Sequence, residues 1–82
     1  MKSMSPFIIY SKDGCVYCQK IKHLLEIYEE KYVEYKLDRD FDKAEFIDKF
    51  GEGSTFPQVI KGDVLLGGSS QTVEYLQDRQ VL

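Results

Sequence analysis

The sequence contains no tryptophan, one histidine, two prolines and two cysteines among its 82 residues. Its longest unbroken apolar run, Phe7 to Tyr10, is far shorter than the roughly 20 residues of a membrane span. Met1 to Pro6 lacks the apolar stretch of a secretory signal. Positive charge is not in excess, since 11 Lys and Arg stand against 14 Asp and Glu, and nucleic acid requires a concentrated basic surface. We therefore expect a cytoplasmic protein that binds neither membranes nor nucleic acid.

Apolar residues nevertheless make up 43% of the chain and aromatic residues 13%, which is too much for a disordered protein. A chain of this length buries only about 60–65% of its unfolded surface, which allows one small core. No linker, repeat or low-complexity segment divides the sequence. We therefore expect residues 1–82 to form a single domain.

The first half of the chain predicts a strand, a helix and a second strand. Residues 7–11 are short, apolar and followed by Lys-Asp-Gly, which is typical of a buried strand. Helical spacing of i, i+3, i+4 and i+7 follows in Ile21, Leu24, Leu25 and Tyr28. Residues 32–37 then alternate and predict a half-buried strand. One of its faces holds Val33, Tyr35 and Leu37, and the other holds Tyr32, Glu34 and Lys36.

Residues 42–51 predict a second helix. Asp42 and Glu45 have the spacing of a capping box, in which each side chain accepts a hydrogen bond from the other residue's backbone. Gly51 stands where a helix is expected to end. The apolar face between these signals consists of Phe46, Ile47 and Phe50.

The last part of the chain predicts a hairpin and a third helix. Residues 58–61 and 64–66 flank Gly62-Asp63, a pair that fits a two-residue hairpin turn. Ser69 and Ser70 precede an apolar pattern, so we expect a serine to cap the last helix. The resulting order is β-α-β-α-β-β-α. Because a strand-helix-strand unit pairs in parallel and a hairpin pairs antiparallel, this order predicts an α/β domain with a mixed four-stranded sheet and three covering helices.

Cys15 and Cys18 stand three residues apart. A structural disulfide between them would close too short a loop to stabilise the fold much, and intracellular disulfides are usually catalytic or redox-sensing. A zinc site needs four ligands as a rule, and beyond this pair only His23 is a typical candidate. A redox-active dithiol is the favoured interpretation; a structural disulfide, or a metal or cluster shared between two chains, stays as an alternative.

The two cysteines are expected to differ in reactivity. Cys15 falls at the start of the first helix, where free N–H groups and the helix dipole favour an anion and lower a thiol's pKa to roughly 3.5–7.5. Cys18 continues the inward stripe of Ile21, so we expect a more buried, resolving thiol. Lys12 is either a positive charge near Cys15 or a solvated loop lysine, and Asp13 opposes it.

Three segments, in order along nearly the whole chain, resemble the motifs of one family. Residues 12–18 (Lys-Asp-Gly-Cys-Val-Tyr-Cys) resemble the active-site segment of dithiol glutaredoxins, usually Cys-Pro-Tyr-Cys. Residues 55–59 (Thr-Phe-Pro-Gln-Val) are similar to the family's Thr-Val-Pro segment, and residues 66–70 (Leu-Gly-Gly-Ser-Ser) resemble its Gly-Gly motif. The resemblance implies a thioredoxin-like fold, and Val16 resembles the residue at this position in small phage-encoded glutaredoxins.

This resemblance implies a glutathione-dependent thiol–disulfide oxidoreductase. Cys15 would take the glutathionyl group from a mixed disulfide and be reset by a second glutathione, and Cys18 would resolve protein disulfides. Glutathione is then a co-substrate, and neither a bound cofactor nor a metal is expected. The residues implied in glutathione binding are Lys12, Tyr17, Thr55, Phe56, Pro57, Gly68, Ser69 and Ser70.

The resemblance also implies roles for these residues. Lys12 and Tyr17 would line the groove, and Lys12 would contact a carboxylate. Phe56-Pro57 would be a cis-proline segment whose backbone binds the cysteine of glutathione. Residues 68–70 would offer N–H groups to the γ-glutamyl carboxylate.

Two residues differ from the usual pattern of the family, and the sequence is compatible with several partners. Val16 replaces the usual proline, and Ser70 replaces an aspartate that meets the amino group of glutathione. The expected protein partners are glutathionylated or disulfide-containing proteins, with ribonucleotide reductase as one candidate, and the chain is expected to be a monomer. Electrons would come from glutathione or from a flavoprotein reductase. The alternatives from other classes are a dimer that holds an iron–sulfur cluster and a pure interaction domain.

Overall fold

The structure, a computed structural model, describes residues 6–80. Within them the elements follow the predicted order. The strands are β1 (Phe7–Ser11), β2 (Tyr32–Lys36), β3 (Gln58–Lys61) and β4 (Val64–Gly67). The helices are α1 (Val16–Ile27), α2 (Lys43–Phe50) and α3 (Ser69–Gln80). The expectation about a secretory signal falls largely on residues 1–5, which lie outside the described part.

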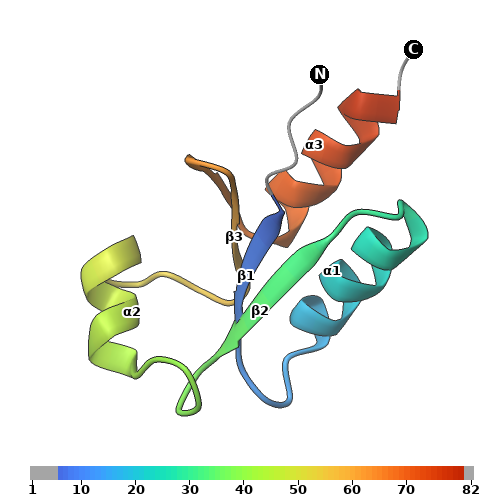
Figure 1. Cartoon of the computed structure of the whole chain (residues 1–82). Helices are drawn as coiled ribbons and strands as arrows, with labels where there is room; N and C mark the ends of the chain where they lie inside the picture. Colours follow the sequence, from blue (N-terminus) through green and yellow to red (C-terminus); the bar gives the residue numbers. More distant parts are fainter. Residues whose placement is uncertain (1–5, 81–82) are drawn as a thin grey trace.

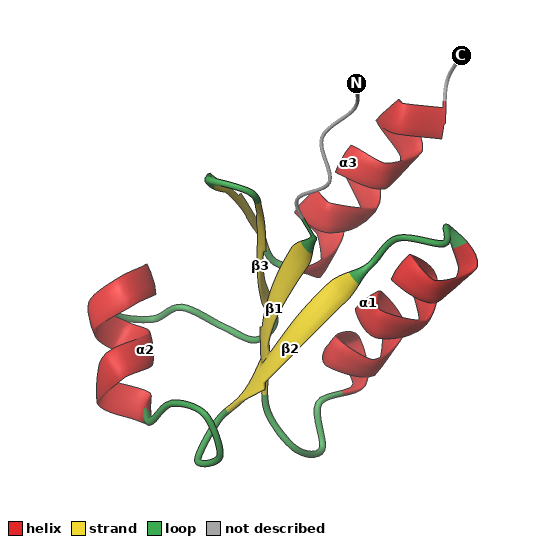
Figure 2. Cartoon of the chain, in the orientation of Figure 1, coloured by secondary structure: helices red, strands yellow, loops and turns green. Residues whose placement is uncertain are grey.

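The sheet has the order β2-β1-β3-β4. β1 pairs in parallel with β2 and antiparallel with β3, and β3 pairs antiparallel with β4. The mixed four-stranded sheet with three helices, and with it the thioredoxin-like fold, is confirmed (Figure 1). The loops that follow the parallel strands β1 and β2 lie at one end of the sheet (Figure 2), so residues 12–15 and 37–42 are brought together there. No helix within residues 6–80 is long and apolar enough to cross a membrane.

The two faces of the sheet are covered differently. α1 and α3 lie on one face and α2 on the other (Figure 1). Because side chains alternate along a strand, every second residue of β1 points into the α1–α3 layer. The core of this layer is aliphatic apart from one ring, and consists of Phe7, Ile9, Ile21, Leu25, Val59 and Leu76. The α2 layer is instead an aromatic cluster, made of Tyr10, Phe41, Phe46, Phe50 and Phe56.

Local signals around α2 and the hairpin are confirmed. Asp42 Oδ1 accepts the N–H of Glu45 at 2.8 Å, and Glu45 Oε1 accepts the N–H of Asp42 at 2.8 Å, which completes the capping box. Gly51 ends the helix with φ of 101°, a left-handed conformation that glycine adopts without a steric penalty. Gly62, with φ of 62°, forms the hairpin turn together with Asp63.

The alternation of the second strand is confirmed up to Lys36, where β2 ends. Its more covered face is the polar one: Tyr32, Glu34 and Lys36 are half-buried, because α1 lies over this face. Val33 and Tyr35 on the other face remain 41% and 38% exposed. Glu34 is accommodated there because it accepts hydrogen bonds from two other elements, as described below.

Candidate active site

Cys15 is the N-cap residue of α1, as predicted. Its backbone is extended, with φ of −100° and ψ of 108°, and its Sγ accepts the N–H of Cys18 at 3.2 Å. The side chain of an N-cap residue satisfies N–H groups that have no partner inside the helix, and a negative charge is favoured there. The first turn of α1, which is fully described, contains no acidic residue to oppose such a charge.

Cys18 is the more buried of the two thiols, as predicted, with 1% of its surface exposed against 8% for Cys15. Burial raises the pKa of the Cys18 thiol to about 12, and a hydrogen bond with Cys15 acts in the same direction. A backbone hydrogen bond from Lys12 acts in the opposite direction. Both cysteines are free thiols in this structure. Cys18 is therefore a protonated thiol at neutral pH, buried behind Cys15.

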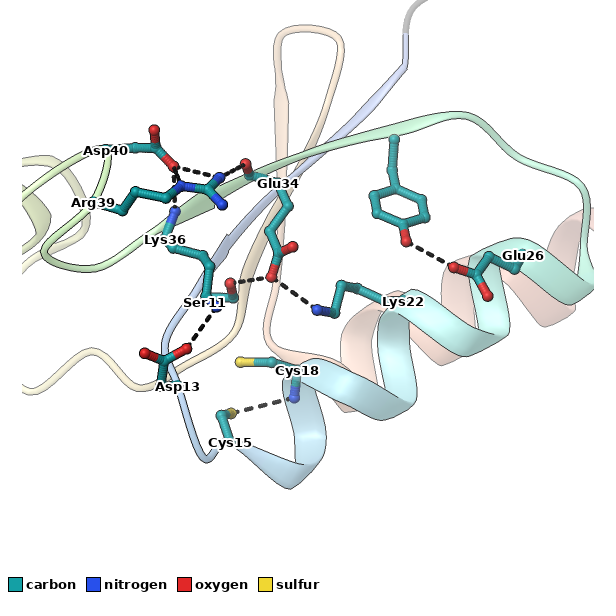
Figure 3. A network of polar contacts seen from close by, with 11 residues as sticks. Ser11, Asp13, Cys15, Cys18, Lys22, Glu26, Glu34, Lys36, Arg39 and Asp40 are labelled. Atoms are coloured by element: carbon teal, nitrogen blue, oxygen red, sulfur yellow. Dashed lines mark hydrogen bonds and ion pairs between the residues drawn. The ribbon is translucent and has the colours of Figure 1, made fainter.

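The loop before Cys15 is tied to the second strand by an ion pair. Asp13 Oδ1 lies 2.6 Å from Nζ of Lys36 (Figure 3). The hydrogen bond from Lys36, followed by the attraction of its charge, holds the pKa of Asp13 below its usual range. Because Lys36 pairs with the carboxylate of Asp13, the negative charge of Asp13 counteracts the positive charge of Lys12 less than the sequence led us to expect.

Lys12 lies between the cysteine loop and the segment that contains the buried proline. Its Nζ lies 5.4 Å from the centre of the Phe56 ring, within the range of a cation–π contact. The side chain also borders a groove of about 400 Å³ between α2 and residues 52–56. We call this the Lys12–Lys43 groove; it is lined by Lys12, Leu37, Lys43, Phe46, Ile47, Glu52, Gly53, Ser54 and Phe56. Its volume is within the range of small-molecule sites, and it carries two lysines.

Phe56 and Pro57 are joined by a cis peptide bond, as the resemblance implies. Phe56 stacks on Phe46 of α2, with ring centroids 4.2 Å apart and planes at 14°. Pro57 is fully buried, and Thr55 is exposed, with its carbonyl accepting a hydrogen bond from Gln58 Nε2 at 2.9 Å. The Phe56 ring therefore fixes this segment between Lys12 on one side and α2 on the other.

The Gly-Gly segment lies next to the proline. A methyl group placed on Gly68 would lie 3.6 Å from the carbonyl oxygen of Pro57. The expectation that a serine caps the last helix is wrong, because α3 already begins at Ser69. Gly68 occupies the cap position, where its N–H donates to Oε1 of Gln71 at 3.0 Å. Ser69 and Ser70 form the first turn, with Ser70 exposed.

The structure brings together four of the residues that the sequence singled out. Lys12, Phe56, Pro57 and Gly68 form a continuous series of neighbours. Tyr17 projects from the first turn of α1, 58% exposed, and its ring contacts Lys20. No group of three or more metal-ligating residues occurs within residues 6–80.

Two features of the site were missed in the sequence. Lys43 lines the same groove as Lys12, and the sequence indicates only that Lys43 stands at the start of α2. Behind Cys18, the side chains of Ser11, Lys22 and Glu34 meet in a polar network (Figure 3). Lys22 lies one helical turn after Cys18, so its sequence spacing predicts that the two side chains lie on the same face of the helix. The position of Glu34 depends on strand pairing, which the spacing of residues does not predict.

The glutaredoxin family model matches residues 7–66, more than half of the chain. The chain therefore belongs to the glutaredoxin family, a family of thiol–disulfide oxidoreductases. The match includes both cysteines and the Phe56-Pro57 segment, and it ends before Gly68.

Individual relatives agree with this assignment. The chain is 40% identical to glutaredoxin 1 of Rickettsia prowazekii over 65 residues, 74% of this chain and 66% of that protein. It is 33% identical to monothiol glutaredoxin-7 of Saccharomyces cerevisiae over 84 aligned positions, 95% of this chain and 41% of that protein. The chain thus spans less than two thirds of either curated relative.

Among solved structures, the fold is similar to a buckwheat glutaredoxin in complex with glutathione. The TM-score is 0.76 at 27% identity, with 94% of this chain and 73% of the buckwheat chain covered.

Proposed function

We propose that this chain is a glutathione-dependent thiol–disulfide oxidoreductase in which Cys15 is the nucleophile and Cys18 the resolving thiol. The observation that carries the proposal is the asymmetry of the two thiols at the start of α1. Cys15 is at the cap position, where the helix N-terminus stabilises a thiolate. Cys18 is 1% exposed and stays protonated until it is needed.

In the first step, the Cys15 thiolate attacks the glutathione sulfur of a mixed disulfide. A bond forms between Cys15 and that sulfur, the old disulfide breaks, and the substrate leaves as a thiolate that takes up a proton from water. A second glutathione thiolate then attacks the glutathione sulfur of the Cys15 adduct. Glutathione disulfide leaves, and Cys15 is a thiolate again.

A protein disulfide follows a second route. Cys15 attacks one of its sulfurs and forms a mixed disulfide with the protein. Cys18 then loses its proton and attacks Cys15, so that the Cys15–Cys18 bond forms and the reduced protein leaves. This route requires both cysteines, whereas the glutathione route requires only Cys15.

The glutathione site that we propose follows the series of neighbours described above. Lys12 and Lys43, which both line the Lys12–Lys43 groove, offer positive charge to a carboxylate. The backbone of Phe56, next to the buried Pro57, offers hydrogen bonds to the cysteine of glutathione. The buckwheat glutaredoxin, a structural relative, is solved with glutathione bound, which supports this choice of thiol.

The other end of the proposed site is the start of α3. N–H groups of a helix's first turn have no partner inside the helix, so those of Ser69 and Ser70 suit the γ-glutamyl carboxylate. The N–H of Gly68 already donates to Gln71, so Gly68 would take part only if the carboxylate replaced that side chain. Tyr17 and Thr55 are exposed, and in this proposal they would contact the bound tripeptide.

The test is turnover of a glutathionylated peptide with glutathione and glutathione reductase. Wild type, Cys15→Ser and Cys18→Ser are compared, and a protein disulfide serves as the second substrate. We expect Cys18→Ser to deglutathionylate the peptide but to fail on the protein disulfide, and Cys15→Ser to fail on both. Activity retained by Cys15→Ser would overturn the assignment of the nucleophile. A wild type that reduces the protein disulfide with a flavoprotein reductase but ignores glutathione would overturn glutathione dependence alone.

A further inference from the structure

Three polar side chains from three elements meet behind Cys18. Oε2 of Glu34, on β2, accepts the hydroxyl of Ser11, at the end of β1, at 2.6 Å. The same oxygen lies 2.9 Å from Nζ of Lys22, on α1 (Figure 3). Ser11 is fully buried, and the side chains of Lys22 and Glu34 are only 19% and 20% exposed. The sequence of any one element would not suggest this network.

The network keeps both charges in a place that is largely closed to water. Burial alone would raise the pKa of Glu34, but the hydrogen bonds from Ser11 and Lys22 outweigh it and hold that pKa below its usual range. Removing two charges from water is unfavourable unless their remaining hydrogen-bonding groups are satisfied. The ammonium group of Lys22 is therefore fixed in position by Glu34, which is in turn fixed by Ser11.

The fixed ammonium group lies near Cys18. Lys22 follows Cys18 by four residues, so both side chains lie on the same face of α1. In Figure 3 the Cys18 sulfur points to the side of the helix where Lys22 meets Glu34. The charge of Lys22 favours the thiolate of Cys18.

The other groups around Cys18 come from the loop before α1. The Cys15 thiol disfavours the Cys18 thiolate, and the backbone of Lys12 favours it. Farther along that loop, Asp13 is paired with Lys36. Lys22 differs from these groups because it places a charged ammonium group on α1, the same helix as the resolving thiol.

We propose that Lys22, held by Glu34 and Ser11, is a positioning residue that stabilises the Cys18 thiolate while it attacks Cys15 in the resolving step. This inference rests on the proposed function, because it needs the two-cysteine route. It goes further because it assigns a residue that affects only the resolving step. The first step, the attack by Cys15, does not involve a charge on Cys18.

Atoms and electrons balance in the resolving step. The Cys18 thiol gives its proton to water, and its sulfur forms a bond with the sulfur of Cys15. The bond between Cys15 and the substrate breaks, and its electron pair leaves with the substrate sulfur, which takes up a proton. Cys15 and Cys18 end as a disulfide, and the substrate ends as a thiol. Lys22 keeps its proton throughout.

The test uses the neutral disulfide dithiodipyridine in stopped flow, because each thiopyridone that leaves is seen by absorbance. The first phase, whose rate rises with reagent concentration, reports attack by Cys15. The second phase, which is independent of concentration, reports attack by Cys18. An opposite charge nearby lowers the pKa of a thiol by about one to two units, and the lower nucleophilicity that follows cancels about half of this gain. We therefore expect Lys22→Met to slow the second phase about 3- to 10-fold, with the first phase within about twofold of wild type.

Two further variants separate charge from structure. Lys22→Arg keeps the charge and is expected to restore most of the second-phase rate. Lys31→Met removes the same charge from the exposed residue just before β2 and is expected to leave both phases unchanged. If Lys22→Met fails to fold because Glu34 is left unpaired, Lys22→Met/Glu34→Gln removes both charges and takes its place, with a slowing of the second phase expected again.

An unchanged second phase in the folded variant would overturn the proposal, as would an equal loss in Lys22→Arg. Failure of the two-cysteine route looks different, because wild type itself would then show no second phase, and failure of glutathione dependence would leave both phases in place.

Discussion

α1 and α2 begin with the same geometry and use it differently. In both helices an extended N-cap residue accepts the N–H of the residue three positions later. The acceptor is Sγ of Cys15 at 3.2 Å from the Cys18 nitrogen in α1, and Oδ1 of Asp42 at 2.8 Å from the Glu45 nitrogen in α2. The Cys-x-x-Cys motif therefore occupies the two positions that Asp42 and Glu45 occupy in a capping box.

The two helices differ in the role of the residue three positions after the N-cap residue. Glu45 reaches back to the N–H of Asp42 and closes the box, so both side chains are committed to holding the helix start. Cys18 instead turns inward and is buried. The cap atom of α1 is held by one hydrogen bond and remains available for chemistry. A helix start that serves a reaction thus gives up part of the stabilisation that a purely structural one keeps.

The largest effect is expected when the chemistry of α1 is removed and its cap is kept. Serine is among the preferred N-cap residues, so Cys15→Ser should fold as stably as wild type, within about 0.5 kcal/mol. Its activity on a glutathionylated peptide should fall to the uncatalysed background, because a hydroxyl group is not ionised at neutral pH. Urea unfolding and turnover are measured on the same preparation. A large loss of stability would show that the sulfur contributes more to the fold than a cap.

The next largest effect concerns how α1 is held on the sheet. Glu34→Gln removes the charge that binds Lys22 and Ser11, and should lower the free energy of unfolding at pH 7 by about 1–3 kcal/mol. Since the folded pKa of Glu34 is lowered, its contribution is full above the unfolded pKa of about 4.3 and is lost as the pH falls through the folded value.

Unfolding measured from pH 7 down to pH 3 tests this sign. The difference in the free energy of unfolding between wild type and Glu34→Gln should narrow toward the acid end. A difference that stays constant over the whole range would contradict an electrostatic contribution of Glu34.

A smaller effect is expected from breaking the capping box of α2. Asp42→Ala should cost about 1 kcal/mol of stability, which lowers Tm by about 4–8 °C in a domain of this size. Asp42→Ser keeps an acceptor at the cap and should recover most of the loss. Turnover should stay within about twofold of wild type in both variants, since Asp42 lies outside the proposed site. Scanning calorimetry gives both Tm values, and equal losses for alanine and serine would argue against capping as the cause.

The smallest effect is expected at the start of α3, where one of the two hydrogen bonds of a capping box is present. Gln71→Ala removes the acceptor of the Gly68 N–H, an exposed hydrogen bond worth about 0.5 kcal/mol. The Tm should fall by only a few degrees. Gln71→Glu keeps an acceptor and serves as the matched control. A loss as large as that of Asp42→Ala would mean that Gln71 does more than accept this bond.

The sequence predicts these elements well where the signal is local. Asp42 with Glu45, Gly51, and Gly62 with Asp63 each define a structure within four residues, and all three predictions are confirmed. Cys15 is at the cap position because the strand ends and the helix begins on either side of it.

Predictions fail or stop where the structure is decided by distant residues. The last helix begins one residue earlier than a serine cap would allow, because the side chain of Gln71 satisfies Gly68 from inside the helix. The polar face of β2 is the covered one because Ser11 and Lys22 supply partners for Glu34 from other elements. The loop residues Phe41 and Phe56 join the aromatic cluster without belonging to any periodic pattern.

In the candidate site, too, the residues that belong to a local motif are predicted from the sequence, and those that the fold brings in from other elements are not. The cysteines and the Phe56-Pro57 segment are visible as motifs. Lys43 is brought to the groove by the packing of α2, and Glu34 is brought to Cys18 by strand pairing. These contacts depend on the whole fold rather than on spacing.

The proposed mechanism requires that the two thiols of α1 differ in reactivity, with Cys15 reacting first and Cys18 only in the resolving step. The most direct measurement treats the reduced, folded protein with less than one equivalent of iodoacetamide at neutral pH and locates the label by peptide mass spectrometry. We expect label on Cys15 and unmodified Cys18. Label on Cys18, or equal label on both cysteines, would contradict it.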